Sequence, residues 1–449
     1  FVAVLLVFAW GNFSLGEKTS PTSLRFKTSV RTGIVFNVLF LFVFKYNHFF
    51  LPEFSTLLQS IGWLGSSQIL TILLPVGLSF LVVQNISYLL DISNNRCAAE
   101  TGFLKFLVYI LYSPKLLSGP VERARAFLPR LDRPLAFDRP LAERSAALVL
   151  TGLLRKIVFA NPLFNMIPAA AFTSPQDYAG QQLVFWLLAY AFALYNDFAG
   201  YTSIVRGVSL WFGIELSANF NLPYYSRNFT EFWTRWHISL SNWLRDYIFF
   251  PLSRSLMRRF PARNHVVNFI LPPLVTLLVS GMWHGLSWNM LVWGGLHGLY
   301  LVLERLPSLW RPALPLDEQP LRRQRTGRVI TFIFAALAWV PFRMQLPVAL
   351  EYWKGMFLWK TPDLVALAQT ITGSRLISGW SDFNLPNPIL LLVLAAAILF
   401  DHYQHRAGRE EFLLGAQRWV QVLLVVILLG AALLAFLSDT TAPFVYQAF

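Results

Sequence analysis

Two histidines flanked by tryptophan are the residues in this sequence best suited to acid–base chemistry. His237 lies in the polar, aromatic stretch Trp236-His-Ile-Ser-Leu-Ser241, and His284 lies in Gly281-Met-Trp-His-Gly285 at the end of an apolar run. An imidazole has an ordinary pKa of about 6.5, so it can accept a proton near neutral pH. Removal from water favours the neutral form that a general base needs. The two positions therefore predict proton transfer in a partly dry cavity.

Both histidines also have a purely structural interpretation. In helical spacing, the apolar face around His237 carries Trp233, Trp236, His237, Leu240 and Leu244. An amphipathic helix of this kind commonly lies at a membrane surface. The tryptophans beside His284 are also typical of the aromatic belt at a membrane–water interface. The residues alone leave both interpretations open.

Four further residues are candidates for a substrate site. Trp236, Trp283 and Asn242 lie beside the two histidines, and we predict that they bind or orient the substrate. Asp197 follows a long apolar stretch, and a carboxylate at membrane depth is a functional candidate by default. The alternative for Asp197 is a helix cap or the partner of a buried arginine.

The sequence gives little support to metal or nucleotide chemistry. Cys97 is the one cysteine, which excludes an internal disulfide and a cysteine-based metal cluster. His402 and His405 form an H-x-x-H pair, but no third ligand follows in a recognisable spacing. The sequence has no phosphate-binding loop, Gly-rich dinucleotide motif or G-x-S-x-G motif. We predict that no metal is bound.

The chain that positions these residues has the composition of a polytopic membrane protein. Of its 449 residues, 55% are hydrophobic and 13% are charged, against about 25% charged in soluble domains. The net charge of +14 falls in short loops between apolar runs, which favours cytoplasmic loops and contact with membrane lipids over nucleic-acid binding. We expect one membrane domain over residues 1–449. Because Phe1 begins inside an apolar run, we also expect that N-terminal helices are missing.

Apolar runs predict an all-α bundle of roughly ten membrane helices, at about 20 residues per crossing. Asn47–Ser67 is expected at the interface, and Gln68–Leu90 is expected to be broken by Pro and Gly. Phe103–Leu117 and Thr202–Leu216 are predicted not to cross fully, the second being separate from the span Leu183–Gly200. The other predicted spans are Thr32–Tyr46, Ala146–Ile167, Val266–Trp283, Trp288–Leu303, Val329–Pro341, Pro388–Phe400 and Trp419–Leu437.

From about residue 30 onward the sequence resembles the membrane-bound O-acyltransferase (MBOAT) family, in particular its bacterial alginate O-acetyltransferase-like branch. The matching segments are Pro75-Val-Gly-Leu-Ser-Phe80, Ser118-Gly-Pro120, Asp197-Phe-Ala-Gly-Tyr201, Asn219-Phe-Asn-Leu-Pro-Tyr224, Glu231-Phe-Trp-Thr-Arg-Trp-His-Ile-Ser-Leu-Ser241, Trp243-Leu-Arg-Asp-Tyr247, Gly281-Met-Trp-His-Gly285 and Pro443-Phe-Val-Tyr446. The long block around His237, together with the later Trp-His-Gly, makes the resemblance specific. One departure is that Pro251-Leu continues as Ser253-Arg-Ser-Leu-Met-Arg-Arg259, where the family often has a Gly-Gly-Asn turn.

The resemblance implies a helical fold around a central tunnel, with His284 as the catalytic histidine and His237 as the second active-site histidine. It implies that an acyl group, with acetyl expected, passes from a cytoplasmic thioester such as acetyl-CoA to a hydroxyl. It places the chain in the bacterial inner membrane. The expected acceptor is an exported polysaccharide, reached through periplasmic or extracellular acceptor proteins.

Two other functions remain open from the sequence. The first is D-alanyl transfer to teichoic acid, within the same family. The second is transport or flipping of an anionic lipid or glycan precursor, which the broken helix at Pro75 and Gly77 and the buried Arg155 and Lys156 would suit. A transporter of this kind predicts inverted repeats, and the sequence shows none.

Overall fold

The computed structural model describes residues 2–19, 26–47, 50–61, 63, 75, 77–261, 266–310, 314–361 and 387–438. Within these ranges the regular structure is helical and contains no strand, which confirms the predicted all-α class. Seven of the described helices are long and apolar enough to cross a membrane. The chain is therefore a multi-pass membrane protein, with fewer such helices in its described part than the ten expected.

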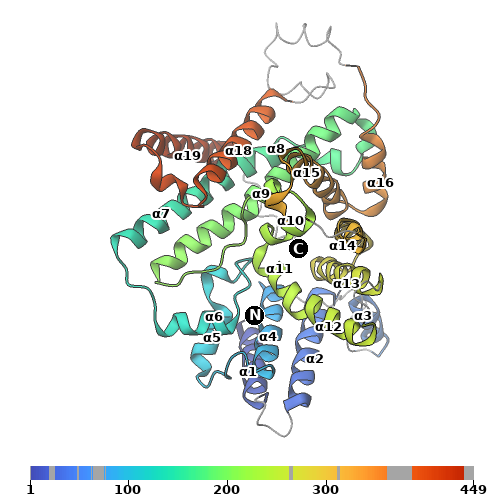
Figure 1. The fold of residues 1–449 in the computed structure, drawn as a ribbon. Helices are drawn as coiled ribbons and strands as arrows, with labels where there is room; N and C mark the ends of the chain where they lie inside the picture. The colour runs from blue at the N-terminus through green and yellow to red at the C-terminus, as the bar shows by residue number, and fades with distance from the viewer. Residues whose placement is uncertain are drawn as a thin grey trace. The chain divides into compact units, whose positions relative to one another are not determined.

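The first of two compact units comprises residues 1–137 and 209–217. Its helices are α1 (Val2–Lys18), α2 (Phe26–Lys45), α3 (Leu51–Ser60), α4 (Leu78–Ser93), α5 (Phe103–Leu111) and α6 (Ala124–Asp132). Helices α1, α2 and α4 pack on one another (Figure 1). A buried hydrogen bond of 2.6 Å from the Asn37 side-chain amide to the Asn12 side-chain oxygen, Oδ1, joins α1 and α2. Satisfying polar side chains between helices in this way avoids the large penalty of an unpaired buried amide.

The length of α5 and the first residue of α4 agree with two predictions from the sequence. Helix α5 has 9 residues, so at about 1.5 Å per residue it is far too short to cross roughly 30 Å of hydrocarbon. Helix α4 begins only at Leu78, directly after Gly77, whose φ of 71° lies in the left-handed region. A Cβ at Gly77 would also collide with the Leu116 carbonyl oxygen, so glycine is required there. The start of α4 at Leu78 agrees with the predicted break at Pro75 and Gly77, while residues 68–74 and 76 of the predicted span Gln68–Leu90 lie outside the described ranges.

The second unit comprises residues 138–208 and 218–449 and holds both candidate histidines. Its helices are α7 (Arg139–Leu153), α8 (Asn161–Asn165), most of α9 (Gly180–Trp211), α10 (Phe229–Arg235), α11 (Ile238–Leu244), α12 (Phe250–Arg259), α13 (Val266–His284), α14 (Trp288–Arg305), α15 (Leu321–Arg343), α16 (Leu346–Gly355), α18 (Pro388–Ala407) and α19 (Arg418–Ser438). Helices α13 and α14 form its most extensive pair and lie side by side in Figure 1, with α15 packed on α14. The motif Pro443-Phe-Val-Tyr446 lies outside the described residues.

Helix α9 corrects one sequence expectation. The predicted separation of Leu183–Gly200 from Thr202–Leu216 is wrong, because one helix of 32 residues runs through both as far as Trp211. Gly200 does not end a helix. A Cβ at this position would approach the Gly152 carbonyl oxygen to 2.7 Å, so its lack of a side chain allows α9 to lie close against α7. Small residues have this packing role in many membrane helices.

Candidate functional site: two buried histidines among aromatic rings

The chain breaks its helix between Trp236 and His237. Helix α10 ends at Arg235, Trp236 is extended, and His237 has a φ of 41° before α11 begins at Ile238. The structural interpretation of the block around His237 as one continuous amphipathic helix is therefore wrong. A non-glycine residue in the left-handed region is disfavoured by roughly 1–2 kcal/mol, so the surrounding structure must hold it there. Such strain often marks a functional site.

Backbone and side-chain bonds from an earlier segment hold this break. The Asn219 carbonyl accepts the Ile238 N–H at 2.9 Å, and the Asn221 N–H donates to the Arg235 carbonyl at 3.0 Å. The Asn219 side-chain oxygen also accepts the hydroxyl of Ser239 at 2.6 Å. Residues 219–221 thus satisfy the backbone groups that the interrupted helix leaves open.

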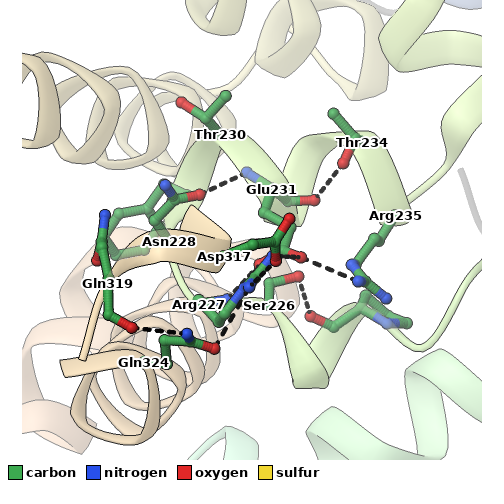
Figure 2. Close-up of polar contacts among 12 residues, drawn as sticks. Ser226, Arg227, Asn228, Thr230, Glu231, Thr234, Arg235, Asp317, Gln319 and Gln324 are labelled. Carbon is green, nitrogen blue, oxygen red and sulfur yellow. Dashed lines mark hydrogen bonds and ion pairs between the residues drawn. The ribbon is translucent and has the colours of Figure 1, made fainter. Parts of the chain in front are cut away.

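A network of polar side chains holds α10, the helix that precedes the break, as Figure 2 shows. Glu231 accepts from the Arg227 N–H at 2.7 Å and from the Arg235 guanidinium at 2.9 Å. Arg227 also donates to Asp317 at 2.7 Å, and the Asn228 side chain caps α10 by accepting the Glu231 N–H. Burial would raise the pKa of Glu231, but the hydrogen bonds from Arg227 and Arg235 outweigh it and lower that pKa. Glu231 therefore remains a charged anchor for the helix.

His237 is buried against helix α9. Its side chain is 1% exposed, and its ring centroid lies 4.9 Å from that of Phe198 and 6.5 Å from that of Trp283. Burial lowers the pKa of His237 to about 3, because the charged form loses its hydration. The imidazole is therefore neutral at physiological pH and carries one N–H donor and one acceptor nitrogen.

His284 is the last residue of α13 and is 6% exposed. Its ring centroid lies 4.8 Å from Trp283, 5.2 Å from Trp293 and 5.2 Å from Phe342. The ring is therefore enclosed by aromatic groups of the protein. This position disfavours the interpretation of His284 as a member of an exposed interfacial belt, which Trp288 at 76% exposure fits better.

Close packing of two helices sets the position of His284. A Cβ at Gly281 would collide with the Met290 carbonyl oxygen, and one at Gly294 would collide with the Leu277 carbonyl oxygen. Both glycines therefore let α13 and α14 approach more closely than other residues would permit. The glycine of Gly281-Met-Trp-His thus has a physical role in placing the histidine three residues later.

The structure brings His237, Trp283 and His284 together. Trp283 has the rings of both histidines as neighbours, at centroid distances of 6.5 Å and 4.8 Å. Trp236 is buried in the supporting aromatic core, with its ring 4.7 Å from Trp339 and 5.1 Å from Phe220. Asn242 is half-buried on α11, and its amide makes no hydrogen bond to a described residue, so its role in substrate binding stays a prediction.

Asp197 belongs to a different polar group. It is fully buried on α9 and forms an ion pair with Lys156. The neighbouring Arg155, 2% exposed, donates to Asp401 at 2.7 Å and to Asn196 at 2.6 Å. These basic residues lie in a π-helical stretch, Leu154–Ala160, between α7 and α8. The pairing agrees with the structural alternative for Asp197, although its partner is a lysine instead of an arginine.

A third histidine, His297 on α14, was not singled out from the sequence. It is fully buried, with its ring centroid 5.2 Å from Trp293 and 5.9 Å from Phe232, on which it stacks. Neither ring nitrogen has a hydrogen-bond partner among the described residues. Trp293 also contacts His284, so one indole joins the two imidazoles. The spacing of Trp293 and His297, one helical turn apart, could have indicated this shared face.

Within the described ranges, no three His, Cys, Asp or Glu side chains gather as a metal site would require. His405 of the H-x-x-H pair lies against Tyr225 at a centroid distance of 4.6 Å. The site brings two buried imidazoles together among aromatic rings, and this arrangement suits proton transfer and hydrogen-bond donation.

Comparison with known proteins places this site in a family. Residues 98–348 match the family model described as MBOAT, membrane-bound O-acyltransferase family. The chain is 31% identical to the probable alginate O-acetylase AlgI of Azotobacter vinelandii, over 79% of this chain and 68% of that protein. It is 30% identical to the peptidoglycan O-acetyltransferase of Helicobacter pylori (72% and 63%), and 30% identical to the teichoic acid D-alanyltransferase of Streptococcus thermophilus (51% and 56%).

These matches confirm the resemblance drawn from the motifs around His237 and His284. The chain belongs to the membrane-bound O-acyltransferase family and is a multi-pass membrane O-acyltransferase.

Proposed function

We propose that this chain transfers an acetyl group from a thioester to a hydroxyl, with His284 as the general base. The observation that carries the proposal is the position of His284 at the end of α13, enclosed by aromatic rings and sharing Trp283 with His237. His284 takes the proton as the hydroxyl oxygen attacks the thioester carbonyl carbon. The tetrahedral intermediate then expels the thiolate, which recovers the proton from the imidazolium. Atoms and charge balance without any metal.

His237 has the second role in this proposal. Since its pKa is lowered to about 3, its neutral ring can donate one N–H to the negative charge that develops on the carbonyl oxygen. The break before α11 fixes the direction of that ring, so little reorganisation is needed during the reaction. Asn242 is proposed as a second donor. Trp283 and Trp236 are proposed to shape the acyl pocket, the first directly and the second as its support.

The proposed donor is acetyl-CoA on the cytoplasmic side of a bacterial inner membrane. Helix α12 exposes Arg254, Arg258 and Arg259, whose charge would attract the phosphates of CoA. The proposed acceptor is an exported polysaccharide, reached through the predicted tunnel and through periplasmic or extracellular acceptor proteins. Two relatives named as O-acetylating enzymes of alginate and peptidoglycan, matched over more than two thirds of this chain, support this choice. We further propose that residues 1–449 work as one membrane domain.

The alternatives have less support. The teichoic acid D-alanyltransferase matches over 51% of the chain, a smaller share than the O-acetylating relatives. A transporter of an anionic precursor would use the buried Arg155 and the half-buried Lys156 as binding charges, but both are already paired with carboxylates. Their positive charge is therefore not available to a substrate without breaking a buried ion pair.

Mass analysis of surface glycans tests this function. The host strain with and without the gene, and with the gene restored, would be compared for ester groups on its polysaccharides. We expect acetyl esters to disappear on deletion and to return on restoration. Loss of D-alanyl esters with unchanged acetyl esters would contradict the proposal and favour the teichoic acid alternative.

A further inference from the structure

The second unit carries a large groove far along the chain from the histidines. It has a volume of about 1020 Å³ and runs along α18, the turn Phe412–Gly415 and α19. Most of its lining is aliphatic, including Ala396, Leu399, Val420, Leu423, Leu424 and Ile427. An apolar groove in a membrane protein is often filled by lipid, so the groove needs a feature that selects one occupant.

Positive charge at one end supplies that feature. Arg406 and Arg409 line the groove where α18 ends, together with the aromatic side chains of Tyr403 and Trp419. Ala396 lies ten residues before Arg406 on the same stretch, which is about 15 Å along a helix. The groove therefore has a basic, aromatic mouth and an apolar length close to one half of a ~30 Å hydrocarbon core.

The acidic residues of the same segment are used elsewhere. Glu410 pairs with Arg206, and Glu411 lies 3.8 Å from Arg144, so both carboxylates face other arginines of this unit. Among the described residues, no carboxylate lies within ion-pair distance of Arg406 or Arg409. The segment thus separates its charges, with the acids turned to the protein and the two guanidinium groups left at the groove. This arrangement is complementary to an anionic head group.

We propose that this groove is a specific site for an anionic phospholipid of the cytoplasmic leaflet. The lipid phosphate contacts Arg406 and Arg409, Tyr403 and Trp419 flank it at head-group level, and one acyl chain lies along Leu399 and Leu423. Basic residues near the α18–α19 turn place this end on the cytoplasmic side, where anionic lipids are abundant. Only 6% of the most apolar part of α19 is buried in the protein. A bound lipid would therefore also join α19 to α18.

Lipid binding to the purified full chain tests this site without any activity assay. In detergent, we expect phosphatidylglycerol to bind more tightly than phosphatidylcholine of the same acyl chains, as measured by native mass spectrometry. The double variant Arg406→Gln/Arg409→Gln should weaken phosphatidylglycerol binding by about 10- to 30-fold, from two head-group charges. The matched control Arg322→Gln/Arg323→Gln removes two exposed charges from α15, outside the groove, and should bind as the wild type does.

A second pair of variants tests the acyl part of the site. Ala396→Trp fills the apolar lining and should weaken binding of both lipids, whereas Ala395→Trp, an exposed neighbour outside the lining, should not. Equal binding of the two lipids by the wild type would overturn the proposal. So would an unaffected Arg406/Arg409 double variant, or displacement of the lipid by inorganic phosphate, which would indicate a site for a soluble anion.

Discussion

Two buried polar regions of the second unit differ in how their groups are kept in a low-dielectric environment. Around Arg155 and Lys156, charged groups are balanced by carboxylates, with Asp401 accepting from Arg155 at 2.7 Å and Asp197 pairing with Lys156. Around His237 and His284, the imidazoles lie among aromatic rings and share Trp283 as a neighbour, and the burial of His237 keeps it neutral. The first region contains charged side chains that neutralise one another in ion pairs. The second contains imidazoles, which can take part in proton transfer.

This difference separates a structural role from a chemical one. A buried ion pair is held in its charged form, and removing one partner leaves an uncompensated charge. A buried neutral imidazole can accept a proton during a reaction and return it, without a permanent counter-ion to relax. We therefore expect variants of the first region to lose stability, and variants of the second to lose activity.

The largest loss of stability is expected for Arg155→Met. Because Asp401 would remain buried without its guanidinium partner, the free energy of unfolding should fall by about 3–5 kcal/mol, and the yield of folded protein should fall with it. Thermal unfolding in detergent would measure the change. The double variant Arg155→Met/Asp401→Leu should recover much of the loss, and Arg322→Met, an exposed arginine on α15, should have little effect. If Arg155→Met were as stable as the wild type, the proposed difference between the ion-paired region and the histidine region would be contradicted.

A smaller but specific loss of activity is expected for Gly281→Ala. The new methyl group would collide with the Met290 carbonyl oxygen and push α13 away from α14, which displaces His284 one turn later. A displacement of about 1 Å can lower the rate about 100-fold. Acetyl transfer should therefore fall much more than the melting temperature. Gly295→Ala is the matched control, since its Cβ would meet only Leu278 at 3.9 Å. Equal activity of the two variants would show that this close approach does not position the histidine.

The smallest effect is a pH dependence of stability from His237. Its pKa is about 3 in the folded protein and about 6.5 when unfolded, so between these values the unfolded chain binds more protons. Stability should therefore fall as the pH is lowered from 7, by about 2 kcal/mol at pH 5 from this group. His237→Gln, which does not titrate, should have a flatter profile in thermal unfolding measured between pH 5 and 7. An identical slope in both proteins would mean that His237 is hydrated.

The sequence was sufficient to find the helices and residues whose signals are local. The apolar run up to His284 predicts α13 to within a residue, and the Gly and Trp beside this histidine mark the site. The break before α11 could not be predicted, because the bonds that stabilise it come from Asn219 and Asn221, more than ten residues earlier. Local periodicity favoured a continuous helix, and a tertiary contact overrode it.

Contacts between helices could not be predicted either, because they join residues that are far apart in the sequence. Gly200 lies inside α9 and packs against Gly152 of α7, and a glycine in a sequence gives no sign of such a neighbour. The partner of Asp197 is Lys156, forty-one residues earlier. From the sequence, Lys156 could be recognised only as a charged residue inside a predicted membrane span. The stacking of His297 on Phe232 could not be predicted, because it joins α14 to α10, whereas the spacing of His297 from Trp293 is a local signal.

In the proposed reaction, the imidazole of His284 accepts the proton of the attacking hydroxyl. The most direct measurement is thiol release from acetyl-CoA by the purified chain in lipid nanodiscs, with polysaccharide acceptor, for the wild type, His284→Ala and the control His402→Ala on α18. We predict that His284→Ala, folded and expressed normally, loses roughly 100-fold or more of its acyl-transfer rate while His402→Ala keeps it. Full activity of His284→Ala would contradict the mechanism.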